Sequence, residues 1–238
     1  MPSVDLEYFA KRRQDIELPL QLSSPALVWS GKAGIWLIAP NKSRTQNRIY
    51  KALDRLAVVT RGTVDAGALV SKAAIYYAYS LASQRSRGDV HARQLAEGVG
   101  RFIAERYYAL LAQPIKAEAA IVQLQATPED DYLAHVDYQG ETEVHEKVYF
   151  LGAVDSASQN RKAEEENVKK LNGELAAAWD PDADVNAIGR IFLSLQTVQR
   201  HEGLRDVFAD ATRREVVLLD RAAYAERRFG DIFRRMDF

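Results

Sequence analysis

The sequence predicts an α+β protein in which two antiparallel sheets are covered by paired helices. Short apolar runs with strand character come in groups, and the groups are closed by turn residues. Amphipathic helical segments come in consecutive pairs, so that after an N-terminal helix the order is β-β-β-α-α-β-β-β-α-α-β. Alternating β-α units would favour a parallel sheet, whereas grouped strands favour antiparallel sheets with helices on their faces.

Composition agrees with a single domain spanning residues 1–238, in which residues 1–23 form an N-terminal tail and helix. The chain has 238 residues, of which 47% are hydrophobic, and this is enough for a sizeable core. The net charge of -1 predicts no general attraction to nucleic acid or to a membrane surface. Without cysteine, and without an apolar run long enough to span a bilayer, we expect a soluble, cytoplasmic protein.

The N-terminal segment predicts a short amphipathic helix over Val4–Glu17. Pro19 and Pro25 then bracket a segment rich in Gln, Ser and Leu, which predicts a loop. One interpretation is a docking helix that covers an edge of the domain.

The first group of strands begins with a hairpin. Ala26–Ser30 and Ile35–Ala39 are short apolar runs separated by a turn with glycine at both ends. Arg48 and Lys51 flank a short apolar turn, and the run Leu56–Thr60, closed by Arg61 and Gly62, predicts a strand buried on both faces.

The first helix pair follows directly. Apolar residues recur at helical spacing over Val64–Arg85, which predicts a long helix with a broad apolar face. We expect Asp89 to cap a second helix that continues to about Leu111, before Pro114.

The second half of the chain repeats this grouping. Three strands, two helices, one strand and a terminal Arg-rich helix are predicted, at Glu118–Gln125, Tyr132–Asp137, Lys147–Leu151, Arg161–Trp179, Val185–Gln199, Glu215–Asp220 and Ala223–Arg235.

Charged and metal-binding residue types give few functional signals. The arginines near the C-terminus are interleaved with Glu215, Asp220, Glu226 and Asp231, which favours ion pairs over a nucleic-acid surface. The four histidines are scattered without a His-x-x-x-His pair, so no metal site is predicted. We expect no cofactor, since no Gly-rich phosphate loop occurs.

Several ordered pieces between about Ser24 and Ala153 resemble the proteasome superfamily, and the rest of the chain resembles it loosely. They include the first hairpin with Asn41-Lys42-Ser43-Arg44, then Arg48-Ile49, Gly62, the segment from Asp89 through Gln94-Leu95, and Gln113-Pro114 before a strand. No single piece is a specific motif, but their order and spacing extend over more than a hundred residues. The sequence looks most similar to the α-type subunits of actinobacterial proteasomes.

This resemblance implies a four-layer α-β-β-α sandwich of the N-terminal nucleophile hydrolase type. It also implies a noncatalytic subunit that forms a homo-oligomeric, heptameric ring, gates substrate entry to a protease chamber and stacks on β-type subunits. ATPase or other ring activators would dock on that ring through their C-terminal tails.

The catalytic residues of the β-type subunits can be compared position by position. The resemblance places Ser24 at the threonine nucleophile, Pro40 near the aspartate and Arg48 at the lysine. A guanidinium stays protonated at neutral pH, and a proline has no carboxylate, so this set lacks the chemistry of an active subunit. The alternative is a β-type or divergent hydrolase whose nucleophile, Ser23 or Ser24, is exposed by processing.

In α-type subunits, the basic residue at the position of Arg48 pairs with the terminal carboxylate of an activator tail. The glycine at the position of Gly62 leaves room for the tail's backbone. The resemblance therefore makes Arg48 and Gly62 the candidate activator-binding residues. The alternative interpretation is that Arg48 pairs with Asp54 or another nearby acid.

Overall fold

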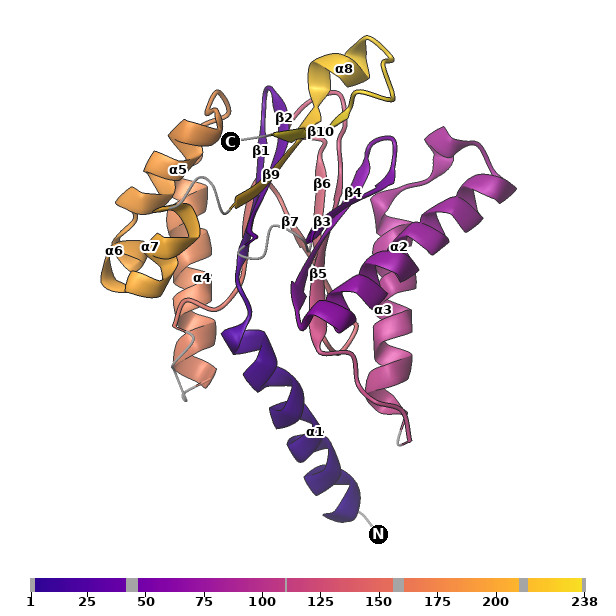
Figure 1. Ribbon diagram of the computed structural model, residues 1–238, viewed down its shortest axis with the longest axis vertical. Helices are drawn as coiled ribbons and strands as arrows, with labels where there is room; N and C mark the ends of the chain where they lie inside the picture. Colours follow the sequence, from indigo (N-terminus) through magenta and orange to yellow (C-terminus); the bar gives the residue numbers. More distant parts are fainter. Residues whose placement is uncertain (1–2, 42–46, 110, 156–160, 210–213, 237–238) are drawn as a thin grey trace.

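The computed structural model describes residues 3–41, 47–109, 111–155, 161–209 and 214–236. In this part of the chain, two antiparallel sheets of five strands each lie face to face, and helices cover both outer faces (Figure 1). The predicted α+β class and antiparallel pairing are confirmed.

The first sheet has the strand order β10-β9-β2-β1-β8. The β1–β2 hairpin places Trp29 opposite Trp36, as the turn between two apolar runs predicts. The five strands are β1 (Ala26–Gly31), β2 (Gly34–Pro40), β8 (Val148–Leu151), β9 (Arg214–Asp220) and β10 (Phe233–Met236).

The second sheet has the order β3-β4-β5-β6-β7. Every residue of β5 is buried, which explains why its central residues 119–122 are all apolar instead of alternating with polar ones. The five strands are β3 (Ile49–Leu53), β4 (Leu56–Gly62), β5 (Ala117–Gln123), β6 (Tyr132–Val136) and β7 (Thr142–His145).

Helices form the two outer layers. On the second sheet lie α2 (Val64–Gln84) and α3 (Ala92–Tyr108), and on the first sheet lie α4 (Arg161–Ala177), α5 (Val185–Ser194), α6 (Gln196–Arg200) and α7 (Glu202–Ala209). One apolar cluster lies under each helical layer and a third lies between the sheets. Within the described residues, no helix combines the length and apolar character needed to cross a bilayer.

Three strands were missed by the sequence prediction. The segment read as a turn after Arg48 is β3, and β7 is a four-residue edge strand whose side chains are mostly exposed. A short polar edge strand has no apolar alternation to detect. The third is β10, which pairs with β9 where a terminal helix was predicted.

Helix boundaries also differ from the prediction. His91 is the N-cap of α3, while Asp89 ends a short 3-10 helix (Arg87–Asp89), so the prediction that Asp89 caps α3 is wrong. The predicted helix over Val185–Gln199 is divided at Leu195 into α5 and α6.

Among the described residues of the C-terminal Arg-rich segment, the one helix is the short α8 (Arg221–Ala225). Arg227, with φ of 57°, and Gly230 then lead the chain back to the sheet edge. The predicted ion pairs are present: Arg234 lies 2.6 Å from Asp220, and Arg228 lies 2.7 Å from Glu226.

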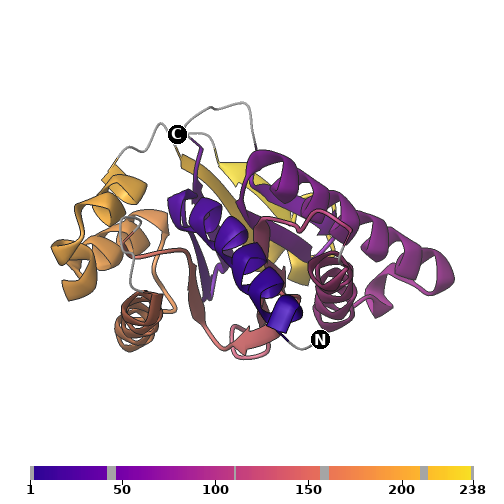
Figure 2. The ribbon, with the colours of Figure 1, turned by 90° about the horizontal axis from the view of Figure 1, so that it is seen from below.

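The N-terminal helix α1 (Ser3–Leu22) is longer than predicted and continues through Pro19. Its inner face buries Ile16 and Leu20 against Tyr107 and Tyr138, and this packing outweighs the one backbone hydrogen bond that proline removes. Seen from below, α1 lies across the ends of both sheets, between the two helical layers (Figure 2). The side chains of residues 3–6 lie outside the described part.

Candidate functional site

A cavity of about 550 Å³ lies where the end of α1, the hairpin β1–β2 and the start of α2 meet. It contains both residues that the sequence predicts for activator binding, Arg48 and Gly62. Lys42, Ser43 and Arg44, which contribute to the resemblance, lie outside the described residues. The cavity is lined by Leu22, Ser23, Ser24, Pro40, Asn41, Asn47, Arg48, Tyr50, Thr60, Gly62, Thr63, Val64, Gly67 and Ala68.

Arg48 lies directly before β3 and is held at its backbone and at its side chain. Its N–H donates to the Glu215 carboxylate at 2.7 Å, and its carbonyl accepts from the Thr60 N–H at 2.9 Å. The guanidinium Nη1 donates to the Ser24 carbonyl at 2.6 Å. Burial, followed by the positive charge of Arg61, lowers the pKa of Arg48 to about 10. Arg48 is therefore still a cation at neutral pH.

In the described part of the chain, the structure does not contain the ion pair between Arg48 and Asp54 that the alternative interpretation predicts. The Asp54 carboxylate lies 3.0 Å from Arg87 and 3.9 Å from Lys51. The side chain of Arg48 instead points to the Ser24 carbonyl at the cavity wall.

Gly62 ends β4 with φ of +132°, a conformation that favours glycine. A Cβ atom at this position would lie 2.1 Å from the carbonyl oxygen of Lys116 and 2.7 Å from the Cα of Ala117. Gly62 therefore has a structural role in the β4–β5 pairing, in addition to any role as an open wall of the cavity.

The three positions compared with a proteasome catalytic set, Ser24, Pro40 and Arg48, come together around this one cavity. Ser24 uses its carbonyl to accept the hydrogen bond of Arg48. The neighbouring Ser23 hydroxyl donates to the Leu20 carbonyl at 2.7 Å, at the end of α1. In this structure the two serine positions thus connect α1 to β1.

Arg61, which lies between the cavity-lining residues Thr60 and Gly62 in the chain, forms a buried ion pair that the sequence analysis missed. Arg61 Nη1 lies 3.0 Å from Glu118 on the paired strand β5, and Arg61 Nη2 donates to the Leu20 carbonyl. Burial alone would raise the pKa of Glu118, but the neighbouring His135 and Arg61 lower it to about 2. Arg61 therefore holds the Leu20 carbonyl near the end of α1, and Arg48 holds the Ser24 carbonyl in the connection to β1.

Two of the histidines described as scattered lie together in space. His135 and His145 both stack against the ring of Tyr149, with ring centroids 5.3 Å and 3.8 Å away. They line a second cavity of about 660 Å³ between the sheet edges. Burial lowers the pKa of His145 to about 4. No cluster of three or more metal-binding side chains occurs among the described residues.

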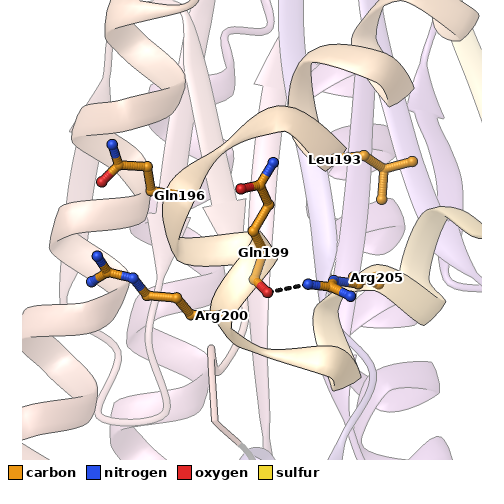
Figure 3. A pocket seen from close by; sticks show the side chains of 5 residues that line it. All are labelled: Leu193, Gln196, Gln199, Arg200 and Arg205. Carbon is orange, nitrogen blue, oxygen red and sulfur yellow. Dashed lines mark hydrogen bonds between the residues drawn. The ribbon is translucent and has the colours of Figure 1, made fainter.

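A third cavity, of about 770 Å³, is open and lies on α5–α7 (Figure 3). Its polar side chains are Gln196, Gln199, Arg200 and Arg205, and Arg205 donates to the Gln199 carbonyl. None of its described lining residues is among those that line the Arg48 cavity.

Comparison with known proteins gives three related sequences, although no family model matches the chain. "Proteasome subunit alpha" of Paenarthrobacter aurescens (strain TC1) is 23% identical over 203 residues, covering 85% of this chain and 79% of the relative. The protein of the same name from Arthrobacter sp. (strain FB24) is 23% identical over 88% of this chain and 82% of the relative. That of Sanguibacter keddieii is 23% identical over 79% of this chain and 68% of the relative. The chain is therefore related to the proteasome α-type subunits of actinobacteria.

Proposed function

We propose that the chain is a noncatalytic α-type subunit of a proteasome-like particle, folded as one domain of the N-terminal nucleophile hydrolase type. The observation that carries this proposal is the similarity to three α-type subunits over most of the chain. The sandwich of two antiparallel sheets between helical layers supports it. So does the cavity at Ser24, Pro40 and Arg48, because these residues supply neither a threonine nor a lysine nor an aspartate.

As an α-type subunit, the chain assembles into a closed, heptameric ring that stacks on β-type subunits and gates their chamber. Closed rings form through heterologous contacts, in which one surface of a subunit meets a different surface of its neighbour. Native mass spectrometry tests the assembly, with the chain alone and with a β-type subunit of the same genome. A mixed particle with rings of both chains is expected. A chain that stays monomeric under both conditions would contradict the proposal.

The second candidate is a hydrolase whose nucleophile is exposed by processing at Ser23 or Ser24. Intact mass distinguishes the two candidates, since the proposed α-type subunit keeps α1. A mature species that starts at Ser23 or Ser24 and hydrolyses peptides would establish the second candidate instead.

The Arg48 cavity is proposed as the docking site for the C-terminal tail of an ATPase or other ring activator. Arg48 is a half-buried cation, and a planar guanidinium suits the two oxygens of a carboxylate. Leu22, Tyr50 and Val64 add apolar contact area for the side chains of the tail.

Removing the guanidinium should weaken binding of such a tail. In Arg48→Ala, a bound carboxylate loses its cationic partner inside the cavity, and we expect a loss of about 2–4 kcal/mol in binding free energy. Calorimetry with a peptide ending in Leu-Tyr-Ala, as free acid and as amide, measures the loss. Arg87→Ala is a matched control because Arg87 is an exposed arginine that pairs with Asp54 outside the cavity. Equal affinity of wild type and Arg48→Ala for the free acid would rule the docking site out.

A further inference from the structure

The chain segment that carries Arg48 is held by two residues from the C-terminal part of the chain. Glu215 on β9 accepts the N–H of Arg48 at 2.7 Å and the N–H of Ile49 at 3.4 Å. Arg235 on β10 donates to Glu215 Oε1, to the Ile49 carbonyl at 3.1 Å and to Asn47 Oδ1 at 3.0 Å. We call Glu215 and Arg235 the clamp.

The clamp connects the two sheets beside the cavity, whose lining includes Asn47 and Arg48. Asn47, Arg48 and Ile49 lead into the edge strand β3 of one sheet, whereas β9 and β10 belong to the other. The Glu215 side chain is only 2% exposed, so its carboxylate needs the nearby N–H groups and the guanidinium to compensate for burial. This arrangement fixes the backbone from which the Arg48 side chain extends.

Arg234, the neighbour of Arg235 on β10, forms an ion pair with a different acid of β9. Arg234 donates to Asp220, also on β9, at 2.6 Å. Both arginines therefore join β10 to β9 through an ion pair, but the contacts to residues 47–49 come from Arg235. Arg234 is the matched control for the clamp.

We propose that Glu215 and Arg235 are positioning residues of the Arg48 cavity, and that β10 thereby controls how strongly the cavity binds a carboxylate. This inference rests on the proposed docking function, which it extends by naming the residues that regulate the site. When the clamp is intact, Arg48 and Ser24 keep one fixed geometry at the cavity wall. When Arg235 is removed, the segment 47–49 loses its link to β10, and the guanidinium samples positions that do not meet the ligand.

The first test measures selectivity for a carboxylate. The probe is the peptide ending in Leu-Tyr-Ala, compared as free acid and as amide, with the full-length chain. Arg235→Ala should reduce the ratio of the two affinities by about tenfold, while Arg234→Ala leaves it unchanged. In an Arg48→Ala background, Arg235→Ala should have no further effect on the ratio, because the two residues act as one unit. Arg235→Lys keeps the charge on β10 and should restore part of the selectivity.

The second test needs no ligand and separates the clamp from the docking function. Hydrogen exchange read by mass spectrometry, with fragmentation that resolves single amides, reports protection of the Arg48 and Ile49 N–H groups. Faster exchange at both amides in Arg235→Ala, and not in Arg234→Ala, is expected because the Glu215 carboxylate is no longer fixed. Unchanged protection in Arg235→Ala overturns the clamp, whatever the peptide does. Faster exchange together with equal affinity of wild type and Arg48→Ala would overturn the docking function and leave the clamp as a structural element.

Discussion

Gly62→Ala should destabilise the protein by at least about 3 kcal/mol, because the new Cβ meets backbone atoms of the neighbouring strand. The nearest atom, the Lys116 carbonyl oxygen, would lie 2.1 Å away, and the backbone cannot swing aside as a flexible side chain could. Gly62 also has φ of +132°, which disfavours any residue with a Cβ. Differential scanning calorimetry should show a melting temperature lower by about 6–12 °C.

The matched control is Gly173→Ala. Gly173 lies inside α4, and a Cβ there would meet nothing within 4 Å. Alanine should stabilise this helix by about 0.5–1 kcal/mol. If Gly62→Ala melted at the wild-type temperature, the close approach of β4 and β5 at this point would be wrong. The same contact means that a side chain at position 62 would disturb the second sheet as well as the cavity, so substitutions of Gly62 do not isolate tail binding.

Much of the fold could be predicted from local patterns. Long apolar runs gave β1, β2, β4 and β5 within one or two residues, and helical periodicity gave α2. The elements that were missed depend on partners distant in sequence. The polar strand β7 pairs with β6 at the sheet edge, and β10 forms because β9 offers it a free edge.

The residues of the candidate site also fall into those that could be placed from the sequence and those that depend on partners distant in the chain. Arg48 and Gly62 were placed by resemblance, and both line one cavity. Glu215 and Arg235 could not be found from the sequence, because they lie more than 160 residues from Arg48 along the chain and reach it only through the packing of two sheets. The cluster of His135 and His145 around Tyr149 was missed for the same reason.

Arg61→Ala should be among the most destabilising substitutions, at about 3–5 kcal/mol near neutral pH. It leaves the Glu118 carboxylate, whose side chain is 12% exposed, without its guanidinium partner at 3.0 Å. It also removes the donor to the Leu20 carbonyl, so the end of α1 loses one of its attachments to β4. Urea unfolding at pH 7 measures the loss of stability, and hydrogen exchange of residues 16–22 should become faster.

The pH dependence of stability tests whether loss of the Arg61–Glu118 ion pair causes this destabilisation. In wild type the pKa of Glu118 falls from its ordinary value of 4.5 to about 2, so the carboxylate stabilises the fold above pH 4.5. This contribution is lost as the pH falls towards 2, because the unfolded chain then binds a proton that the folded chain does not. Without Arg61 the pKa of Glu118 rises, and the stability difference between wild type and Arg61→Ala should therefore shrink from pH 7 to pH 3. Adding Glu118→Gln to Arg61→Ala should recover part of the lost stability, since it removes a buried charge that has lost its guanidinium partner. An equal difference at both pH values, with no recovery in the double variant, would show that Arg61 acts through its contact with α1 alone.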